Sequence, residues 1–331
     1  LRYSKTGAES YFDSSGNLKK IGDKVKISGM AETLKKIAKY GPDIFYKGEI
    51  AEKISEDMKK NGGLLSYEDL STYSTKWTDP LVGKYRDFGI STNHPPGGGI
   101  MLLEMLNILE NFNLSKLGHN SKEYIRVVCE AMKQATVDKE SFVGDPDFVN
   151  VPIRRLLSKK HARQCSKHIL SGQKINIDRI GQFESKDTTH VSVVDKHGNC
   201  VTMTHSLGMP SGVITDGLGF MYNGCMAVFD PRPGRAGSIE PGKSRFSSLA
   251  PTIVTKDSSP YMILGAPGGT QIAMGILQTI LNVIEFKMNM LEAVSAPRFS
   301  ATSNIIDVTN RIPSFVTEGL EELNYNVQRS A

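Results

Sequence analysis

The chain has 331 residues, with 40 Lys plus Arg against 35 Asp plus Glu and a formal net charge of +5. This mild charge, with no block of one sign, argues against a nucleic-acid partner, and the 39% share of apolar residues excludes a disordered chain. No run approaches about 18 apolar residues, which excludes a membrane-spanning helix. Residue 1 is Leu, so any signal peptide lies upstream; a cytoplasmic location is favoured slightly over a periplasmic or secreted one.

The first half of the chain is predicted to be mostly helical. Apolar residues at helical spacing predict helices that end at Gly-Pro, Gly-Gly or Gly-Asp-Pro breakers, over residues 29–40, 49–61, 100–111, 121–142 and 151–170. Ser66 and Asp69 have the spacing of a capping box that opens a further helix. Weak alternation over residues 82–91 indicates a strand. The run at 95–99, Pro-Pro-Gly-Gly-Gly, is incompatible with regular structure.

The second half is predicted to consist of hairpins backed by a helix. Alternation of apolar and polar residues predicts strands, turns separate them, and a long apolar helix follows Gly268-Gly269. The predicted strands are 188–194, 200–206, 251–255 and 261–265, with turns at 196–199 and 257–260, a Pro- and Gly-rich loop at 231–243 and a helix at 270–286.

Thr188 stands at the head of the first of these strands, in the run Asp187-Thr188-Thr189-His190. Two threonines are compatible with plain β-propensity. A second interpretation is chemical. If the bond between Asp187 and Thr188 is cut, the new α-amine of Thr188 can act as the general base for its own hydroxyl.

Two further segments have side chains or backbone suited to a substrate. Gly268 and Gly269 join a strand to a helix, where free N–H groups can hold a developing oxyanion, although a simple left-handed turn explains them equally. Ser247 and Ser248 precede a strand; they make a turn there or offer hydroxyls to a substrate carboxylate.

These segments together resemble the γ-glutamyltranspeptidase family. The similar segments are residues 41–48, 61–64, 95–99, 144–148, 188–206 (TTHVSVVDKHGNCVTMTHS), 245–253 (RFSSLAPTI) and 265–270 (GAPGGT). They cover nearly all of the chain in order, and their combination is far more specific than any one of them.

The resemblance implies an α+β fold, the four-layer αββα sandwich of N-terminal nucleophile hydrolases. It implies a precursor that cuts itself before Thr188 into a large-subunit portion, 1–187, and a small-subunit portion, 188–331, which together form one αββα domain. Thr188 is then the catalytic nucleophile, with Ser206 at the position of a supporting threonine of the family. Gly268 and Gly269 match the oxyanion-hole glycines.

The resemblance also assigns substrate contacts and shows where they fail. Ser247 and Ser248 match serines that bind the glutamyl α-carboxylate. In the family, an Asn-Asn-(Gln/Glu)-Met-Asp-Asp run binds the α-amine; the matching stretch here starts at Asn223 and has Cys225 at the Gln/Glu position and Val228 at the aspartate position.

Val228 offers no hydrogen-bond acceptor to an ammonium group. A second residue that contacts the α-amine in the family is an asparagine, and the matching position here is Gly208. Asp230 could rearrange to take over, but loss of γ-glutamyl specificity is the preferred interpretation. Arg232 and Arg235 then suit an acidic amide substrate, unless they are charges on a loop surface. The family also has a segment before Leu1, with an arginine that clamps the α-carboxylate, and a final strand after Ala331.

No metal site or cofactor is expected. The histidines lack metal-ligand spacing, and His190 is expected to make a structural hydrogen bond. The four cysteines are expected to be small buried residues. The expected partners are a small-molecule amide or γ-glutamyl substrate with an acceptor amine or water. The two cleaved fragments are expected to associate, and a homodimer is allowed.

Three functions remain open from the sequence. The leading one is a self-cleaving γ-glutamyltransferase-like acyltransferase or amide hydrolase that works through a Thr188 ester. The second is an amidase or acylase of the same family that acts on a non-glutamyl acidic amide. The third is an uncleaved, non-catalytic relative that acts as a binding protein.

Overall fold

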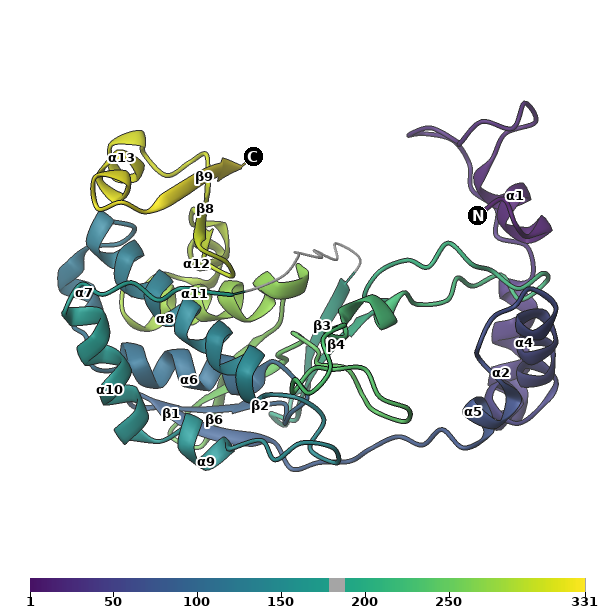
Figure 1. The fold of residues 1–331 in the computed structure, drawn as a ribbon, viewed down its shortest axis with the longest axis horizontal. Coiled ribbons are helices and arrows are strands. Elements are labelled where there is room, and N and C mark those ends of the chain that lie inside the picture. The colour runs from purple at the N-terminus through teal and green to yellow at the C-terminus, as the bar shows by residue number, and fades with distance from the viewer. Residues whose placement is uncertain (179–187, 331) are drawn as a thin grey trace. The chain divides into compact units, whose positions relative to one another are not determined.

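The part of the chain that the structure, a computed structural model, describes is residues 1–178 and 188–330, and it divides into two units. Unit 1 contains residues 1–77 and 209–224, and unit 2 contains the remaining described residues (Figure 1).

Unit 1 is a group of helices around a small apolar core. Its helices are α1 (Lys5–Tyr11), α2 (Met30–Tyr40), α3 (Asp43–Tyr46), α4 (Glu49–Lys60) and α5 (Tyr67–Ser71). The buried core comes from α4, α5 and one residue of the distant segment 209–224, and consists of Ile50, Ala51, Ile54, Leu70 and Leu218. The capping box predicted at Ser66 and Asp69 is confirmed at the start of α5.

The segment 209–224 is held in unit 1 by hydrogen bonds from three helices. Asp216 accepts one from the Thr6 amide of α1 at 2.8 Å, and Thr215 donates one to Asp57 of α4 at 2.6 Å. Thr33 of α2 donates one to the carbonyl oxygen of Leu218 at 2.8 Å. These bonds join residues that lie more than 150 positions apart, so this association is tertiary and has no local sequence signal.

Unit 2 is built on a four-stranded antiparallel sheet in the order β1-β2-β5-β6. The strands are β1 (Leu81–Tyr85), β2 (Phe88–Thr92), β5 (Thr252–Lys256) and β6 (Ser259–Leu264). The stretch 82–91, predicted as one strand, is a hairpin instead. Arg86 adopts a φ of 52°, in the left-handed region that a tight turn requires.

Helices pack against this sheet and against one another. They are α6 (Gly99–Leu109), α7 (Leu114–Leu117), α8 (Lys122–Phe142), α9 (Ile153–Leu156), α10 (Lys159–Leu170), α11 (Ile272–Ile284), α12 (Met290–Ser295) and α13 (Ser314–Glu322). Helix α6 is buried along its whole length and contacts β1, β2, α8, α10 and α11. A helix that is apolar all round belongs in a core, so α6 is the centre of unit 2.

The single helix predicted over 151–170 is wrong, because the chain forms two. Helix α9 ends at Leu156, and the side chain of Ser158 accepts the His161 amide to start α10 at Lys159. An N-capping serine has an extended backbone, and this interrupts the helix although the basic pattern continues through it.

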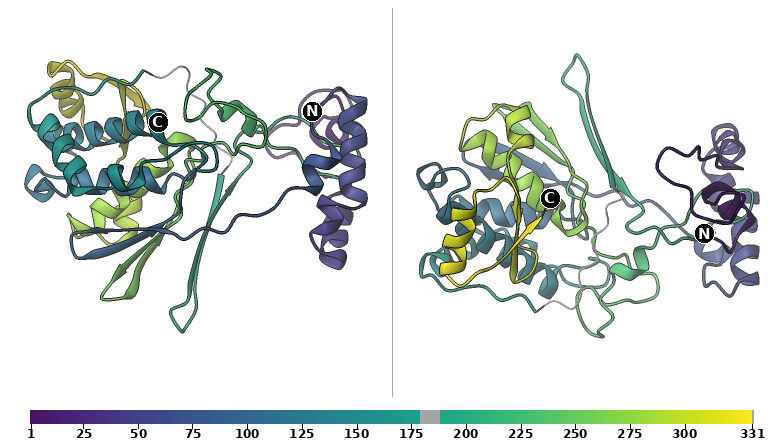
Figure 2. Two further views of the ribbon diagram at one scale, coloured as in Figure 1. Left: turned by 60° about the horizontal axis from the view of Figure 1, so that its bottom comes forward. Right: turned by 90° about the horizontal axis from the view of Figure 1, so that it is seen from above.

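A separate two-stranded sheet, β3 (Thr188–Val194) with β4 (Cys200–Ser206), forms a long hairpin. Its turn projects away from the rest of unit 2 in both views of Figure 2, and Val193, Val194 and Val201 of its outer half are more than half exposed. A third sheet has β7 (Phe299–Ser300), β8 (Ile305–Thr309) and β9 (Asn326–Ser330), the last pair parallel. No local sequence pattern predicts this third sheet.

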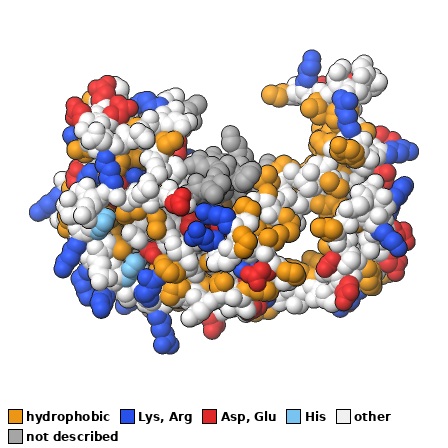
Figure 3. Space-filling model, viewed as in Figure 1, with side chains coloured by type: hydrophobic (Ala, Val, Ile, Leu, Met, Phe, Trp, Pro, Cys, Tyr) orange, Lys and Arg blue, Asp and Glu red, His pale blue; other side chains and the backbone are white. Residues whose placement is uncertain are grey.

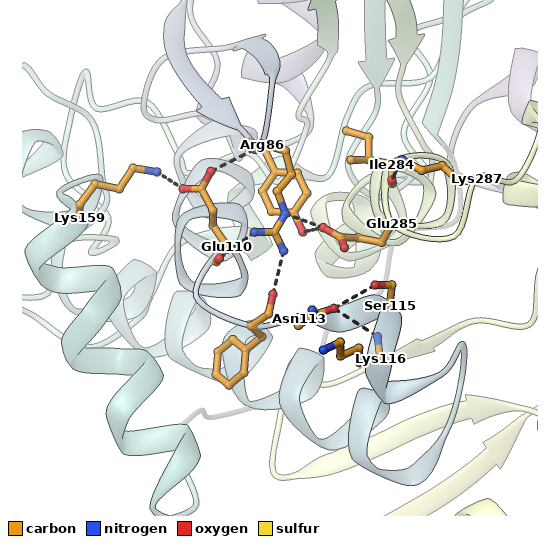
Figure 4. Close-up of polar contacts among 11 residues, drawn as sticks. Arg86, Glu110, Asn113, Ser115, Lys116, Lys159, Ile284, Glu285 and Lys287 are labelled. Atoms are coloured by element: carbon orange, nitrogen blue, oxygen red, sulfur yellow. Dashed lines mark hydrogen bonds and ion pairs between the residues drawn. The ribbon is translucent and has the colours of Figure 1, made fainter.

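The end of the β1–β2 hairpin is tied to helices α6 and α11 by a polar network (Figure 4). Glu285, just after α11, accepts hydrogen bonds from the Tyr85 hydroxyl at 2.6 Å and from Arg86 Nε at 2.8 Å. The Arg86 guanidinium also donates to the carbonyl oxygens of Glu110 and Phe112. Burial and the Glu285 carboxylate raise the pKa of Tyr85 far above its usual value, so its hydroxyl stays a donor.

The surface carries charges of both signs. On the face drawn in Figure 3, Lys and Arg side chains are interspersed with Asp and Glu rather than gathered in one band. Among the helices in the described ranges, none is long and apolar enough to cross a bilayer.

Candidate active site

Thr188 is the first residue of β3 and lies opposite Ser206, the last residue of β4. The Thr188 hydroxyl donates a hydrogen bond to the Ser206 hydroxyl oxygen at 2.9 Å, and both residues are partly buried. The predicted nucleophile and its predicted supporting hydroxyl are therefore in contact. Asp187, on the other side of the predicted cleavage bond, lies outside the described residues.

The turn after β4 fixes the position of the Ser206 oxygen. The Gly208 amide donates to it at 2.9 Å, so this oxygen accepts from a backbone donor and from Thr188. Gly208 has a φ of 68°, and a Cβ there would lie 2.4 Å from Cys225 Sγ. The Cys225 thiol in turn donates to the Leu207 carbonyl oxygen at 3.2 Å. Cys225 thus packs against this turn.

His190 joins the hairpin to the end of β6. Its Nδ1 lies 2.8 Å from Thr204 Oγ1 and its Nε2 lies 3.0 Å from Ser192 Oγ. The ring packs so closely on Gly265 that a Cβ at that glycine would lie 2.0 Å from Nδ1. Burial lowers the pKa of His190, which favours the neutral ring. The hydrogen bonds expected for this histidine are present.

Gly268 and Gly269 occupy backbone conformations that favour glycine. Gly268 has a φ of 123° and Gly269 a φ of 55°. They follow β6 and lead through the 3₁₀ turn η2 (Gly269–Gln271) into α11. The strand-to-helix junction predicted from sequence is confirmed. Backbone N–H groups at such a helix start are the donors that an oxyanion needs.

Ser247 and Ser248 are placed by the glycine-rich run at 95–99. The Ser247 amide donates to the Pro96 carbonyl oxygen at 2.7 Å, and the Gly98 amide donates to the Leu249 carbonyl oxygen at 2.9 Å. A Cβ on Gly98 would lie 2.4 Å from the Ser248 carbonyl oxygen. The glycines thus permit two segments about 150 residues apart to pack backbone to backbone.

Asn93 reinforces this contact from the end of β2. Its Nδ2 donates to the Leu249 carbonyl oxygen at 2.7 Å, and its Oδ1 accepts the Gly99 amide at 3.0 Å. No sequence motif marks Asn93 as a functional residue. Its only signal is its position two residues before the Pro-Pro-Gly-Gly-Gly run.

Arg232 is engaged by Asp230 in the loop before Ser247. Arg232 Nε lies 2.9 Å from Asp230 Oδ1, and Nη2 lies 2.7 Å from Oδ2. This forked contact lowers the pKa of the Asp230 carboxyl. Asp230 is thus already bound by a guanidinium, which makes it a poor replacement acceptor for a substrate ammonium group.

The remaining candidates fall on either side of the unit boundary. Asn223 belongs to unit 1, where it pairs with Pro210 in an isolated antiparallel bridge. Cys225 and Val228 belong to unit 2, on the 3₁₀ turn η1 (Cys225–Val228). Val228 is 38% exposed there and has no polar side-chain atom.

The fold and the threonine at the head of a strand point to an N-terminal nucleophile hydrolase, and the comparisons agree. The family model described as "Gamma-glutamyltranspeptidase" matches residues 1–331. The chain belongs to the γ-glutamyltranspeptidase family.

Curated relatives carry two kinds of name. The "Glutathione hydrolase proenzyme" of Escherichia coli (strain K12) is 37% identical over 310 residues, which are 88% of this chain and 53% of the relative. The "Acylase ACY 1 proenzyme" of Pseudomonas sp. (strain V22) is 38% identical over 307 residues, which are 92% of this chain and 55% of the relative. The chain thus spans about half the length of these relatives.

A solved structure with the same fold is the cephalosporin acylase from Bacillus halodurans. It is 28% identical and has a TM-score of 0.85, and the match covers 97% of this chain and 59% of that one. The predicted fold class, α+β of the N-terminal nucleophile hydrolase type, is confirmed.

Proposed function

We propose that this chain carries the catalytic threonine of a self-cleaving amide hydrolase or acyltransferase. The observation that carries the proposal is the 2.9 Å hydrogen bond between the hydroxyls of Thr188 and Ser206 at the head of β3. The names of the relatives, a glutathione hydrolase and an acylase that are both proenzymes, support it.

Self-cleavage begins with attack of Thr188 Oγ on the carbonyl carbon of Asp187. The peptide nitrogen leaves as the α-amine of Thr188, and an ester forms; water then hydrolyses this ester and releases the carboxylate. The products are a large portion, 1–187, and a small portion, 188–331. They remain associated as one αββα domain.

Catalysis repeats the same chemistry on a substrate amide. The free α-amine of Thr188 takes the hydroxyl proton as Oγ attacks the carbonyl carbon, and the amide N–H groups at Gly268 and Gly269 hold the oxyanion. The proton passes to the leaving amine, and a threonyl ester remains. Water or an acceptor amine then resolves the ester.

The test of this mechanism is a pair of neighbouring threonine variants. The wild type should show two fragments, cut before Thr188, on a denaturing gel and by mass spectrometry. Thr188→Ala should stay a single chain without amidase activity. Thr189→Ala changes an exposed neighbour on the same strand and should cleave normally. An intact wild-type chain, or full activity in Thr188→Ala, would contradict the proposal and favour a non-catalytic binding protein.

Two features favour an acidic amide over a γ-glutamyl substrate. Val228 replaces the expected ammonium acceptor, and Asp230 is bound by Arg232. Ser247 and Ser248 still offer hydroxyls for a carboxylate. We therefore infer an acyl group that has a terminal carboxylate but no α-amine.

A matched pair of substrates tests this specificity. Glutaryl-p-nitroanilide and γ-glutamyl-p-nitroanilide differ only by the α-amine, and mass spectrometry detects the acyl adduct on Thr188 for either. We expect a larger kcat/KM for the glutaryl compound. Faster turnover of the γ-glutamyl compound would contradict this inference while leaving the threonine mechanism intact.

A further inference from the structure

Three ionisable side chains from three helices meet inside unit 2, on elements other than the β3–β4 hairpin that holds Thr188. His161 Nε2 of α10 lies 3.0 Å from Glu104 Oε1 of α6 and 3.2 Å from Asp138 Oδ2 of α8. The side chains of Glu104, Asp138 and His161 are 2%, 6% and 12% exposed. One donor atom from each residue lies within 4.8 Å of the other two.

Glu104 is the residue that makes this cluster unusual. It is the only charged residue of α6, a helix that is buried at every position and otherwise almost wholly apolar. Burying a carboxylate there is costly unless a cation or hydrogen bonds compensate it. The helix therefore has a specific partner for Glu104, and that partner is His161.

The polar contacts of the cluster converge on one imidazole nitrogen. The Nε2 atom of an imidazole carries at most one proton, yet it faces two carboxylates, and Cys165 Sγ lies 3.6 Å from the same atom. The Gln134 amide donates a further bond to Asp138 at 2.6 Å. The cluster thus brings two carboxyl groups and one imidazole nitrogen to the same buried point.

The distances from His161 Nε2 to the two carboxylate oxygens are close to the distance between two ligands of one tetrahedral metal ion. Zinc binds nitrogen and oxygen at about 2.0–2.1 Å, which places two such ligands about 3.3 Å apart, and binds sulfur at about 2.3 Å, which places sulfur about 3.6 Å from a nitrogen ligand. The observed separations from His161 Nε2 are 3.0, 3.2 and 3.6 Å. Cys165 lies four residues after His161, on the same face of α10.

We propose that Glu104, Asp138 and His161 form a binding site for a divalent transition-metal ion of the Zn²⁺ type. Imidazole, carboxylate and thiol donors are those that zinc prefers. The ion would join α6, α8 and α10 and act structurally, separately from the Thr188 site. The spacing of these residues in the sequence did not suggest a metal site, because each ligand comes from a different helix.

Zinc alone is the probe for the experiment, with the untagged protein first treated with a chelator. Competition against a chromogenic chelator should show one bound equivalent, and Zn²⁺ should raise the unfolding temperature by a few degrees. His161→Gln should lower the Zn²⁺ affinity at least about 100-fold. His168→Gln changes an exposed histidine of the same helix and should bind as the wild type does.

Measurements on the wild type keep the proposal testable if His161→Gln does not fold. X-ray absorption at the zinc edge should show imidazole scattering and a nitrogen and oxygen shell at about 2.0–2.1 Å. Glu104→Gln, which keeps the side-chain volume, should also weaken binding. The proposal fails if the wild type binds no stoichiometric Zn²⁺, if the absorption spectrum lacks a histidine ligand, or if a folded His161→Gln binds as tightly as the wild type.

Discussion

The hydroxyls of Thr188 and Ser206 are hydrogen-bonded at 2.9 Å across the antiparallel β3–β4 pair. The same Ser206 oxygen accepts the Gly208 amide, so a backbone donor also holds its position. The Thr188 hydroxyl proton therefore points to Ser206 in this structure, and in the proposed mechanism it turns to the α-amine once the chain is cut.

Ser206→Ala removes this orienting bond. A neutral hydrogen bond contributes about 0.5–1.5 kcal/mol, so we expect kcat to fall up to about tenfold, with slower self-cleavage. Ser206→Thr keeps the hydroxyl and should remain close to wild type. His205→Ala alters the exposed adjacent residue and serves as the control in the same steady-state assay. An unchanged kcat in Ser206→Ala would show that the Ser206 hydroxyl has no part in the mechanism.

Gly268→Ala should damage the junction between β6 and α11. An alanine at a φ of 123° is strained by about 1–3 kcal/mol, and the turn would relax away from its present shape. We expect a loss of amidase activity with little change in overall fold by circular dichroism. Gly275→Ala, in the middle of α11, has open space around its Cβ and should raise the free energy of unfolding by about 0.5–1 kcal/mol. Equal activity in the two variants would argue against an oxyanion role for the turn.

Asn93→Ala should loosen the contact that positions Ser247 and Ser248. It removes two side-chain hydrogen bonds and leaves the Leu249 carbonyl with one partner fewer, a cost of about 1–3 kcal/mol. We expect a lower free energy of unfolding in urea and a KM that rises more than kcat falls. Asn111→Ala, at the exposed end of α6, should leave KM unchanged. An unchanged KM in Asn93→Ala would show that this contact does not support substrate binding.

The stability of the hairpin contact should depend on pH through His190. Burial lowers its pKa in the folded protein below the unfolded value of about 6.5. The folded state therefore binds fewer protons than the unfolded state, and the free energy of unfolding falls as the pH drops below about 6.5. Above about pH 6.5 His190 is neutral in both the folded and the unfolded state, so it no longer lowers the free energy of unfolding.

Urea unfolding at pH 7.5 and pH 5 measures this effect. The stability of the wild type relative to His190→Gln should decline at the lower pH, because the variant has no group to protonate there. His197→Gln, in the exposed turn of the same hairpin, should keep the wild-type decline. An identical pH dependence in the wild type and in His190→Gln would show that His190 is not the group responsible.

Local sequence patterns predicted the elements whose signals are local. The capping box at Ser66, the strands 188–194 and 200–206 and the glycine junction before α11 all agree with the structure. The resemblance to the family had placed Ser206 beside Thr188, and the register of β3 with β4 pairs the two residues. The prediction of one strand over 82–91 failed because a two-residue turn at Arg86 leaves the apolar pattern intact.

The sequence by itself determined the family and, through that resemblance, the fold class, because both depend on motifs that occur in a fixed order along the chain. Only the tertiary structure decided which distant groups touch. Gly98 packs on Ser248, and Glu104 lies beside His161, in both cases across more than 50 residues. Such contacts depend on the packing of whole helices and sheets, whose positions follow from the burial of the entire core rather than from any one segment.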